Sequence, residues 1–408
     1  MKPSMMIMDH DVAKDILTAD SKYFPSRFTY NHANADPMTA TLFNLRGDHW
    51  KDLRKEVTQA FTTAKLKKAF HRIHFETKSL VCGTQAKLNN YGPELDIREL
   101  VLKHMISTLS IFGLGVNCNI YEDGNVYDKI MYYFEDNRYP PWIRSIIASF
   151  PDFFKKFSIV VTPSGMKEFY LGLVKNALKT RNPKGDVDFI MQVFLKMFSG
   201  TMTNQEIASL YASFLDAIVT TSGSFICEAL YEMSLHPDMQ EQLRKEIHQQ
   251  TEELTLETLK KYEYLDNVVS ETLRLHHSDA QISRLCEKDY YIPKWDLTIE
   301  EGVLIIIPNF GFQMDPDNFP NPDTFDPDRF AGGALDNINP ITFMPFGMGN
   351  RNCIAGDFGR TLFKITVLEM VKNFEFTVGK KTQVPIEYQP LELRMPMNKL
   401  YLNVRSLK

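Results

Sequence analysis

The stretch from Phe343 to Gly356, which reads FMPFGMGNRNCIAG, constrains the fold more than any other part of this chain. Gly347 and Gly349 permit positive φ angles and leave no Cβ beside the backbone, so a flat ligand can lie close to it. An apolar run with helical period follows over 358–371 and predicts a helix. The positive end of its dipole would stabilise a thiolate at Cys353. The pattern therefore predicts a glycine-rich turn that presents one cysteine at the start of a helix.

A buried structural cysteine beside a turn is the simplest alternative, because free cysteine is among the most buried residue types. The spacing of the neighbouring residues argues against it. The chain reads Phe-x-x-Gly-x-Arg-x-Cys-x-Ala here, and this pattern resembles the ligand loop of the cytochrome P450 family, the haem-thiolate monooxygenases. The resemblance implies that Cys353 is the proximal ligand of a haem b iron, where its electron donation favours O–O cleavage. It also implies that this loop contacts the haem through Phe346, Gly347, Arg351, Cys353 and Ala355.

The composition is that of a globular protein with a large core. The 408 residues are 44% apolar and carry a net charge of −5. This charge argues against nucleic acid as a partner, because phosphate neutralisation needs an excess of Lys and Arg. The five cysteines are scattered, with no Cys-x-x-Cys and no histidine at zinc spacing, so we expect reduced thiols. Residues 1–14 contain no long apolar run, which predicts neither a signal peptide nor a spanning helix there.

Periodicity predicts a mainly α fold with a small β portion, the cytochrome P450 fold by resemblance. Helical patterns cover 66–90, 97–113, 204–236, 239–249 and 261–276, and strand patterns cover 5–8, 290–293, 303–307, 374–378 and 399–404. No internal repeat and no low-complexity linker interrupts them, so we expect a single haem-thiolate domain over 1–408. Residues 5–9 resemble a strand and turn that follow a membrane anchor in microsomal relatives. The resemblance thus implies that the N-terminal anchor and first strand are absent from this chain.

Glu271 and Arg274 stand one helical turn apart and, taken alone, would be an ordinary surface pair of little energetic value. Together with the cysteine loop they resemble the Glu-x-x-Arg pair of the family, and Arg329, in FDPDRF, resembles the third member of that network. The resemblance implies that both arginines share Glu271 in a buried structural network, where removing one partner would leave an uncompensated charge.

Trp50 and Arg54 form a Trp-x-x-x-Arg motif on one face of a predicted helix. Alone, the motif describes a helix with an aromatic residue facing the core and an arginine in water. By resemblance, it faces a haem propionate. Arg351 would then supply a second cation for the propionates.

The distal side of the site departs from the family pattern. The family's central helix usually reads Ala-Gly-x-[Asp/Glu]-Thr, whereas this chain reads Ala217-Ile218-Val219-Thr220-Thr221. The resemblance implies that Ala217 lies against the haem and that Thr221 hydrogen-bonds the iron-bound oxygen. Ile218 replaces a glycine and adds bulk above the haem. Thr220 replaces the acid and cannot act as a carboxylate shuttle.

Two further differences lie after the Glu-x-x-Arg pair. Gln313 stands where a histidine often contacts a propionate, and an expected pair of prolines is missing after Leu275. His276 and His277 occur there instead. Adjacent histidines at a helix end point in different directions, which favours a solvated helix terminus over a metal site.

Two segments suggest surfaces for partners. The aromatic residues of Phe150–Phe157 are interrupted by prolines, and the resemblance implies that this region covers the substrate pocket and dips into a membrane. The basic residues of Lys51–Lys68 would be only a solvated face on their own. The resemblance makes them a docking surface for an acidic NADPH-cytochrome reductase. The resemblance also implies that the protein is located on the cytosolic face of the endoplasmic reticulum membrane.

The sequence as a whole most resembles the microsomal, xenobiotic-oxidising branch of the family, particularly arthropod detoxification types. The expected function is insertion of one oxygen atom from O₂ into an apolar organic substrate, with electrons from the reductase. A haem-thiolate isomerase or dehydratase that acts on oxygenated lipids without O₂ is the first alternative, because the acid at position 220 is missing. A truncated haem-binding relative with little activity is the second, because of Ile218 and the expected N-terminal loss.

Overall fold

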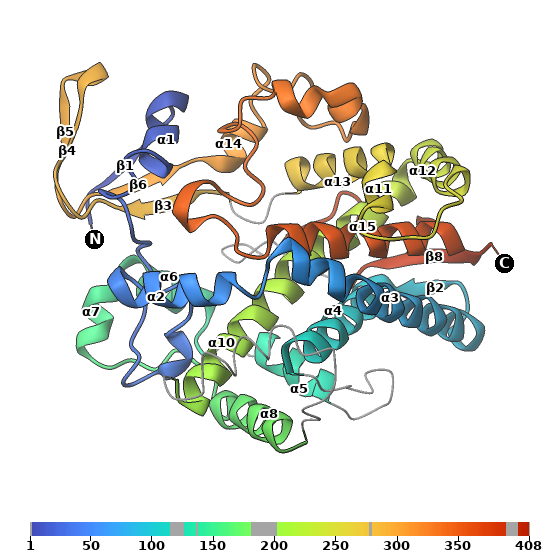
Figure 1. The fold of residues 1–408 in the computed structure, drawn as a ribbon, viewed down its shortest axis with the longest axis horizontal. Coiled ribbons are helices and arrows are strands. Elements are labelled where there is room, and N and C mark those ends of the chain that lie inside the picture. Colours follow the sequence, from blue (N-terminus) through green and yellow to red (C-terminus); the bar gives the residue numbers. More distant parts are fainter. Residues whose placement is uncertain are drawn as a thin grey trace.

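A computed structural model describes residues 2–114, 126–135, 138–180, 202–276, 280–388 and 399–407. Helices predominate in it, and the strands form small sheets at one end and along one side (Figure 1). The prediction of a mainly α fold with a small β portion is confirmed. His277 lies outside the described residues.

The largest helices surround the main apolar core, and each has an apolar face turned towards it. These are α3 (Thr63–Tyr91), α4 (Ile97–Leu114), α8 (Met166–Thr180), α10 (Asn204–Ala217), α11 (Gly223–Leu235), α12 (Pro237–Gln249), α13 (Glu263–Leu275) and α15 (Gly356–Asn373). The shorter helices are α1 (His10–Leu17), α2 (Gly47–Thr58), α5 (Val126–Glu135), α6 (Pro141–Ser149), α7 (Pro151–Lys156) and α14 (Asn309–Gln313).

The central helix of the fold consists of α10 and α11, joined without a break by a π-helical turn at Ile218–Ser222. It begins at a capping box in which the Thr203 side chain accepts from the Glu206 amide and Glu206 accepts from the Thr203 amide. Among the described residues, this Asn204–Leu235 helix is the one long and apolar enough to cross a membrane, but 78% of its most apolar window is buried inside the protein. It therefore serves as a core helix, along which the neighbouring helices pack.

In the part of the chain that the structure describes, the strands form two three-stranded sheets and one hairpin. The first sheet has the order β1 (Ser4–Met6), β6 (Leu304–Ile307), β3 (Ile282–Leu285), with β1 parallel and β3 antiparallel to β6. Ile305 and Ile307 of β6 are fully buried, so the alternation of apolar side chains fixes its register. The second sheet has the order β2 (Glu94–Asp96), β8 (Tyr401–Ser406), β7 (Phe374–Val378), and the hairpin pairs β4 (Tyr290–Ile292) with β5 (Leu297–Ile299).

The prediction that His276 ends a helix in solvent is wrong. His276 is only 8% exposed, and its Nε2 lies 2.7 Å from Oε1 of the buried Glu232 on α11. Its Nδ1 lies 2.6 Å from the hydroxyl of Tyr388. Both ring nitrogens have partners, so this histidine ties the end of α13 to the central helix and to the C-terminal part of the chain.

Candidate active site

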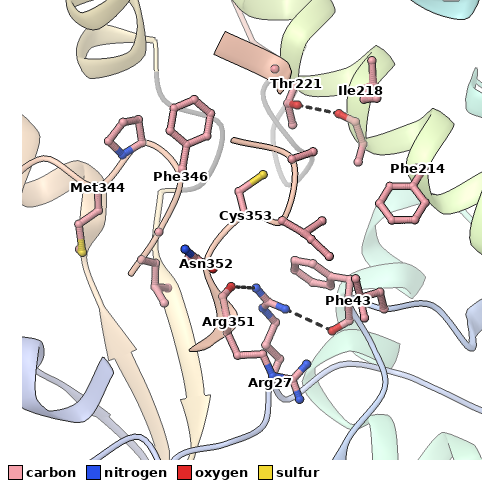
Figure 2. Close-up of a pocket in the computed structure, with 18 of the residues that line it drawn as sticks. Arg27, Phe43, Phe214, Ile218, Thr221, Met344, Phe346, Arg351, Asn352 and Cys353 are labelled. Atoms are coloured by element: carbon pink, nitrogen blue, oxygen red, sulfur yellow. Dashed lines mark hydrogen bonds between the residues drawn. The ribbon is translucent and has the colours of Figure 1, made fainter. Parts of the chain in front are cut away.

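A cavity of about 310 Å³ lies where the cysteine loop, the central helix and the 25–46 segment meet. The loop forms one wall, and α10 and the π-turn form the opposite wall (Figure 2). Residues of β3 also line the cavity. Most of the surface is apolar. Cys353 is exposed to this cavity, which excludes the alternative of a cysteine packed in the core.

The backbone of the loop holds Cys353 in place. Its amide donates to the Phe346 carbonyl at 2.7 Å, and the Gly347 amide donates to the Met344 carbonyl at 2.9 Å. Gly347 and Gly349 adopt φ angles of +70° and +74°, as the glycine pattern predicts. The helix α15 starts three residues after the cysteine, so the positive end of its dipole lies close to Cys353 along the chain.

Gly349 also lies against the end of α1. A Cβ at this position would stand 1.7 Å from the Leu17 carbonyl oxygen, a distance that only a shift of the backbone can relieve. We expect Gly349→Ala to destabilise the protein by several kcal/mol and to lower its haem content, since both φ strain and a steric collision are added. Urea unfolding and the haem-to-protein ratio measure the two effects.

Gly332→Ala is the matched control, because Gly332 has a similar φ of +61° but a Cβ added there would meet nothing within 4 Å. The control substitution carries the left-handed backbone cost alone, about 1 kcal/mol. Equal losses in the two variants would show that the contact with Leu17 is unimportant.

One face of the central helix forms the opposite wall of the cavity. Phe214, Ala217, Ile218 and Thr221 line the cavity, as Figure 2 shows for the three of them that it labels. The Thr221 hydroxyl donates to the Ala217 carbonyl at 2.6 Å. Thr220 behaves differently from its neighbour, because its hydroxyl donates to the Asp216 carbonyl at 2.7 Å and it is not among the residues that line the cavity.

The predicted pair on α2 lies beside the loop. The Arg351 guanidinium stacks on the Trp50 ring at 3.6 Å from its centroid, a close cation–π contact. Arg54 donates to the carbonyl and to the side-chain oxygen of Asn352, at 3.0 and 2.7 Å. Trp50, Arg54 and Arg351 all line the cavity together with the cysteine loop.

The sequence analysis missed two charged residues of the cavity, Arg27 and Arg284. Arg27 donates to the Arg351 carbonyl at 2.9 Å and stacks on Phe43 at 4.0 Å. Arg284, on β3, is 3% exposed and also lines the cavity. No local pattern in the sequence marked either arginine as part of the cavity. Gln313, by contrast, lies away from the cavity and donates to the carbonyls of Leu273 and Arg274.

The charged side chains that line the cavity favour binding of an anion. Among the described residues that line it, the charged side chains are four arginines, with no carboxylate: Arg27, Arg54, Arg284 and Arg351. Burial, aided by the neighbouring arginines, lowers the pKa of Arg351 to about 9, and burial together with Arg27 lowers the pKa of Arg284 to about 9. The Nη1 of Arg351 is buried without a hydrogen-bond partner. A ligand that carries negative charge would stabilise such a cluster.

These features fit haem b. A thiol available for deprotonation faces an apolar space between two walls, one of which has glycine in place of side chains. The arginine cluster suits two propionates, which are carboxylates that arginine binds in a bidentate manner. The residues present therefore match a flat, apolar, dianionic cofactor with a metal that accepts sulfur.

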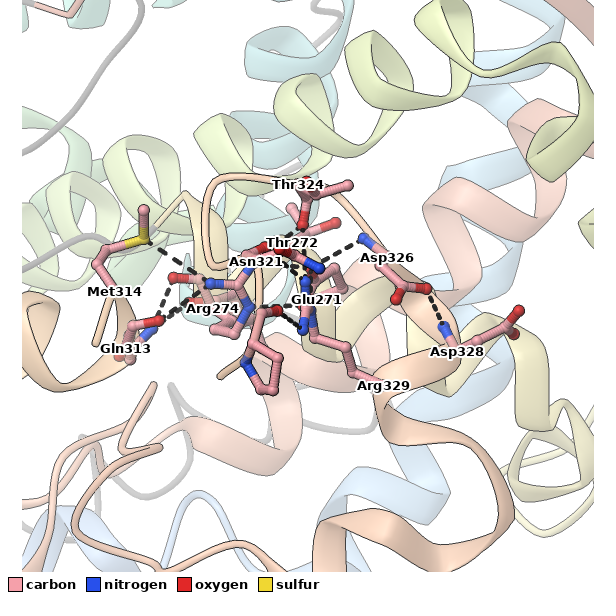
Figure 3. A network of polar contacts seen from close by, with 12 residues as sticks. Glu271, Thr272, Arg274, Gln313, Met314, Asn321, Thr324, Asp326, Asp328 and Arg329 are labelled. Atoms are coloured by element: carbon pink, nitrogen blue, oxygen red, sulfur yellow. Dashed lines mark hydrogen bonds and ion pairs between the residues drawn. The ribbon is translucent and has the colours of Figure 1, made fainter. Parts of the chain in front are cut away.

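The predicted network behind the loop is also formed (Figure 3). Glu271 and Arg274 are both fully buried and share two hydrogen bonds, from Arg274 Nε and Nη2, at 2.7 and 2.8 Å. Arg329 Nε donates to the same carboxylate at 3.2 Å, and so does the Asp326 amide at 2.9 Å. The α13 helix is thereby fixed to the irregular segment that leads into the cysteine loop.

Comparison with known proteins agrees with this geometry. The family model for cytochrome P450 matches residues 1–404. Cytochrome P450 6a2 of Drosophila melanogaster is 30% identical, over all of this chain and 85% of its own length. Cytochrome P450 6A1 of Musca domestica is 27% identical, over all of this chain and 84% of its own length. With its cysteine loop, arginine-lined cavity and Glu271 network, the chain belongs to the cytochrome P450 family.

Proposed function

We propose that the chain forms a single domain, and that the residues of its cavity bind the haem b of this haem-thiolate monooxygenase in specific roles. Cys353 binds the iron, and Trp50, Arg54 and Arg351 hold the propionates. The observation that carries the proposal is the exposure of Cys353 to an apolar cavity whose charged lining residues are arginines. Arg27 and Arg284 add to the same cationic cluster. Phe346, Gly347, Ala355 and Ala217 flank the space in which the macrocycle fits.

When bound, the haem supplies the activation of dioxygen and the transfer of one of its atoms to the substrate. The protein excludes water and handles protons. Phe214 and Ile218 make the distal wall apolar, which favours an apolar organic substrate over a polar one. The Thr221 hydroxyl stands on that wall and serves as the proton donor to the bound oxygen, and Thr220 stabilises the π-turn through its bond to the Asp216 carbonyl. With no acid at position 220, water is expected to relay protons to Thr221.

The surfaces around the site support proposals for partners. Exposed apolar side chains occur together on α6 and α7 and just after α7, namely Trp142, Ile146, Phe153 and Phe157. A face of this kind suits contact with a membrane, here the cytosolic side of the endoplasmic reticulum.

The basic segment Lys51–Lys68 remains the proposed docking face for an acidic NADPH-dependent reductase. Lys55 and Lys68 are exposed there. Lys51 pairs with Asp48 at 2.9 Å, and Lys67 pairs with Glu257 at 2.5 Å. These exposed pairs are weak, so an acidic partner can compete for both lysines.

Oxidation of an apolar probe tests the proposed function. The haem-loaded protein is mixed with a microsomal NADPH-cytochrome reductase, and O-dealkylation of 7-ethoxycoumarin is followed with and without NADPH. We expect turnover that requires NADPH and O₂. Turnover of a fatty acid hydroperoxide without reductant, in place of NADPH-dependent oxidation, would instead identify a haem-thiolate isomerase or dehydratase. Normal haem content with neither reaction would identify a haem-binding relative with little activity.

A further inference from the structure

The central helix is buried over most of its length and is accessible on one side. Between residues 207 and 234 all residues are buried except Ser213, Asp216, Ala217 and Thr221. Positions three and four apart on a helix lie on one face, so these four residues share a side of the helix. Ser213, Ala217 and Thr221 line the cavity of the active site. Asp216 therefore lies at the margin of the same cavity.

The Asp216 carboxylate has no hydrogen-bond or ion-pair partner among the described residues. Only its main-chain carbonyl is bonded, to the Thr220 hydroxyl at 2.7 Å. Burial alone raises the pKa of the Asp216 carboxyl to about 6, with no contribution from a hydrogen bond or from a neighbouring cation. A carboxyl with this pKa is still mainly ionised at neutral pH. The helix thus carries a negative charge into the interior without the partner that buried carboxylates normally have.

The four arginines of the cavity leave this charge in place. They donate to Asn352 and to main-chain carbonyls, and none of them affects the pKa of Asp216. The wall beside Asp216 is apolar and includes Phe214 and Ile218 (Figure 2). A single negative charge next to an apolar wall is complementary to an apolar molecule that carries a single positive charge.

The fold itself does not use the acid at position 216. The bond that the helix makes at this position goes to the carbonyl, which any residue supplies. A neutral side chain of the same size avoids the cost of burying a charge, so the acid lowers the stability of the protein. Groups that lower stability in this way are typical of binding sites, where a ligand supplies the missing partner.

We propose that Asp216 pairs with an ammonium group of the substrate, and that the substrates of this enzyme are apolar amines. The inference rests on the proposed function and narrows its substrate class. Ser213, one turn earlier, offers a second contact. Its hydroxyl donates to the Leu210 carbonyl at 2.8 Å, so its oxygen is free to accept a hydrogen bond from the ammonium. The remainder of the substrate then lies against the apolar wall.

Two probes that differ only in charge test this inference on the haem-loaded protein at neutral pH. The phenylpropyl trimethylammonium ion carries a fixed positive charge, and its nitrogen has no lone pair for the iron. The second probe is the hydrocarbon in which carbon replaces that nitrogen. Equilibrium dialysis gives the Kd of each. Asp216→Asn should weaken binding of the cation at least about tenfold and change the Kd of the hydrocarbon by less than about threefold.

A second readout needs no ligand. The folded state holds the proton of Asp216 more tightly than the unfolded state does, so the ionised acid destabilises the fold at neutral pH. Asp216→Asn should therefore unfold at a higher urea concentration than the wild type. An equal or lower midpoint would show that the fold already compensates the acid, which contradicts the inference.

Two further variants make the result decisive. Asp238→Asn removes an exposed carboxylate at the start of α12 and should leave both Kd values and the urea midpoint unchanged. Asp216→Leu should act in the same direction as Asp216→Asn, and it replaces that variant if the latter fails to fold. An unchanged Kd for the cation, or equal losses for the two probes, would overturn the proposal. Absence of NADPH-dependent oxidation of 7-ethoxycoumarin in the wild type would instead count against the proposed function, and the two dialysis constants would still test Asp216.

Discussion

Replacing Cys353 by alanine is expected to abolish the carbon monoxide band that a reduced, thiolate-ligated haem gives, and to lower oxidation of a probe substrate at least about a hundredfold. The sulfur is exposed to the cavity and stands at the start of α15. Among the described residues that line the cavity, Cys353 is the one thiol and no histidine is present to replace it. Loss of the sulfur therefore leaves the iron without its strong protein ligand.

Optical spectra of the reduced protein under carbon monoxide provide the measurement, with activity on 7-ethoxycoumarin beside them. Cys82→Ala is the matched control, because Cys82 is also exposed but lies on α3, outside this cavity. It should keep the band and the activity. A band that survives in Cys353→Ala, with haem still bound, would show that another residue holds the iron and that the site has been assigned wrongly.

The elements that sequence can predict are those with local causes. The 204–236 helix follows from a continuous apolar period, and the structure has it as Asn204–Leu235, interrupted only in its hydrogen-bond pattern by the π-turn. Asp9 stands directly before the first helix with a side chain that N-cap positions favour, and its carboxylate accepts from the amides of Asp11 and Val12. The cysteine loop can be predicted from the sequence because its glycines and its cysteine lie within a few residues of one another.

The elements that sequence misses depend on contacts across the chain. Arg27 donates to the carbonyl of Arg351, a residue 324 positions later in the sequence, and no local pattern marks such a contact. A histidine at the end of a helix is expected to be exposed to solvent. His276 is instead held by Glu232, which lies 44 residues earlier on another helix. The central-helix motif of the family predicts that Thr220 lines the cavity. In the fold, its hydroxyl is occupied by the Asp216 carbonyl, and only the next threonine lines the cavity.

The second large effect is expected at Glu271, where Glu271→Gln should destabilise the protein by about 3–5 kcal/mol. The substitution keeps the shape of the side chain but removes its charge. Arg274, which is fully buried, and Arg329, which is largely buried, would then lack the carboxylate that both of them share. Since a domain is stable by only about 5–15 kcal/mol in total, much of the protein should be unfolded or free of haem at physiological temperature.

Urea unfolding of the wild type and the variant measures this difference, and the haem-to-protein ratio reports the state of the cysteine loop. The chain offers a matched control in Glu241 and Arg244 on α12, which are also one turn apart and lie 2.5 Å from each other. Glu241 is half exposed, so Glu241→Gln should cost less than about 1 kcal/mol. Similar losses at both positions would mean that burial adds nothing to the Glu271 pair. The irregular segment before Cys353 would then owe its position to packing, and not to a shared carboxylate.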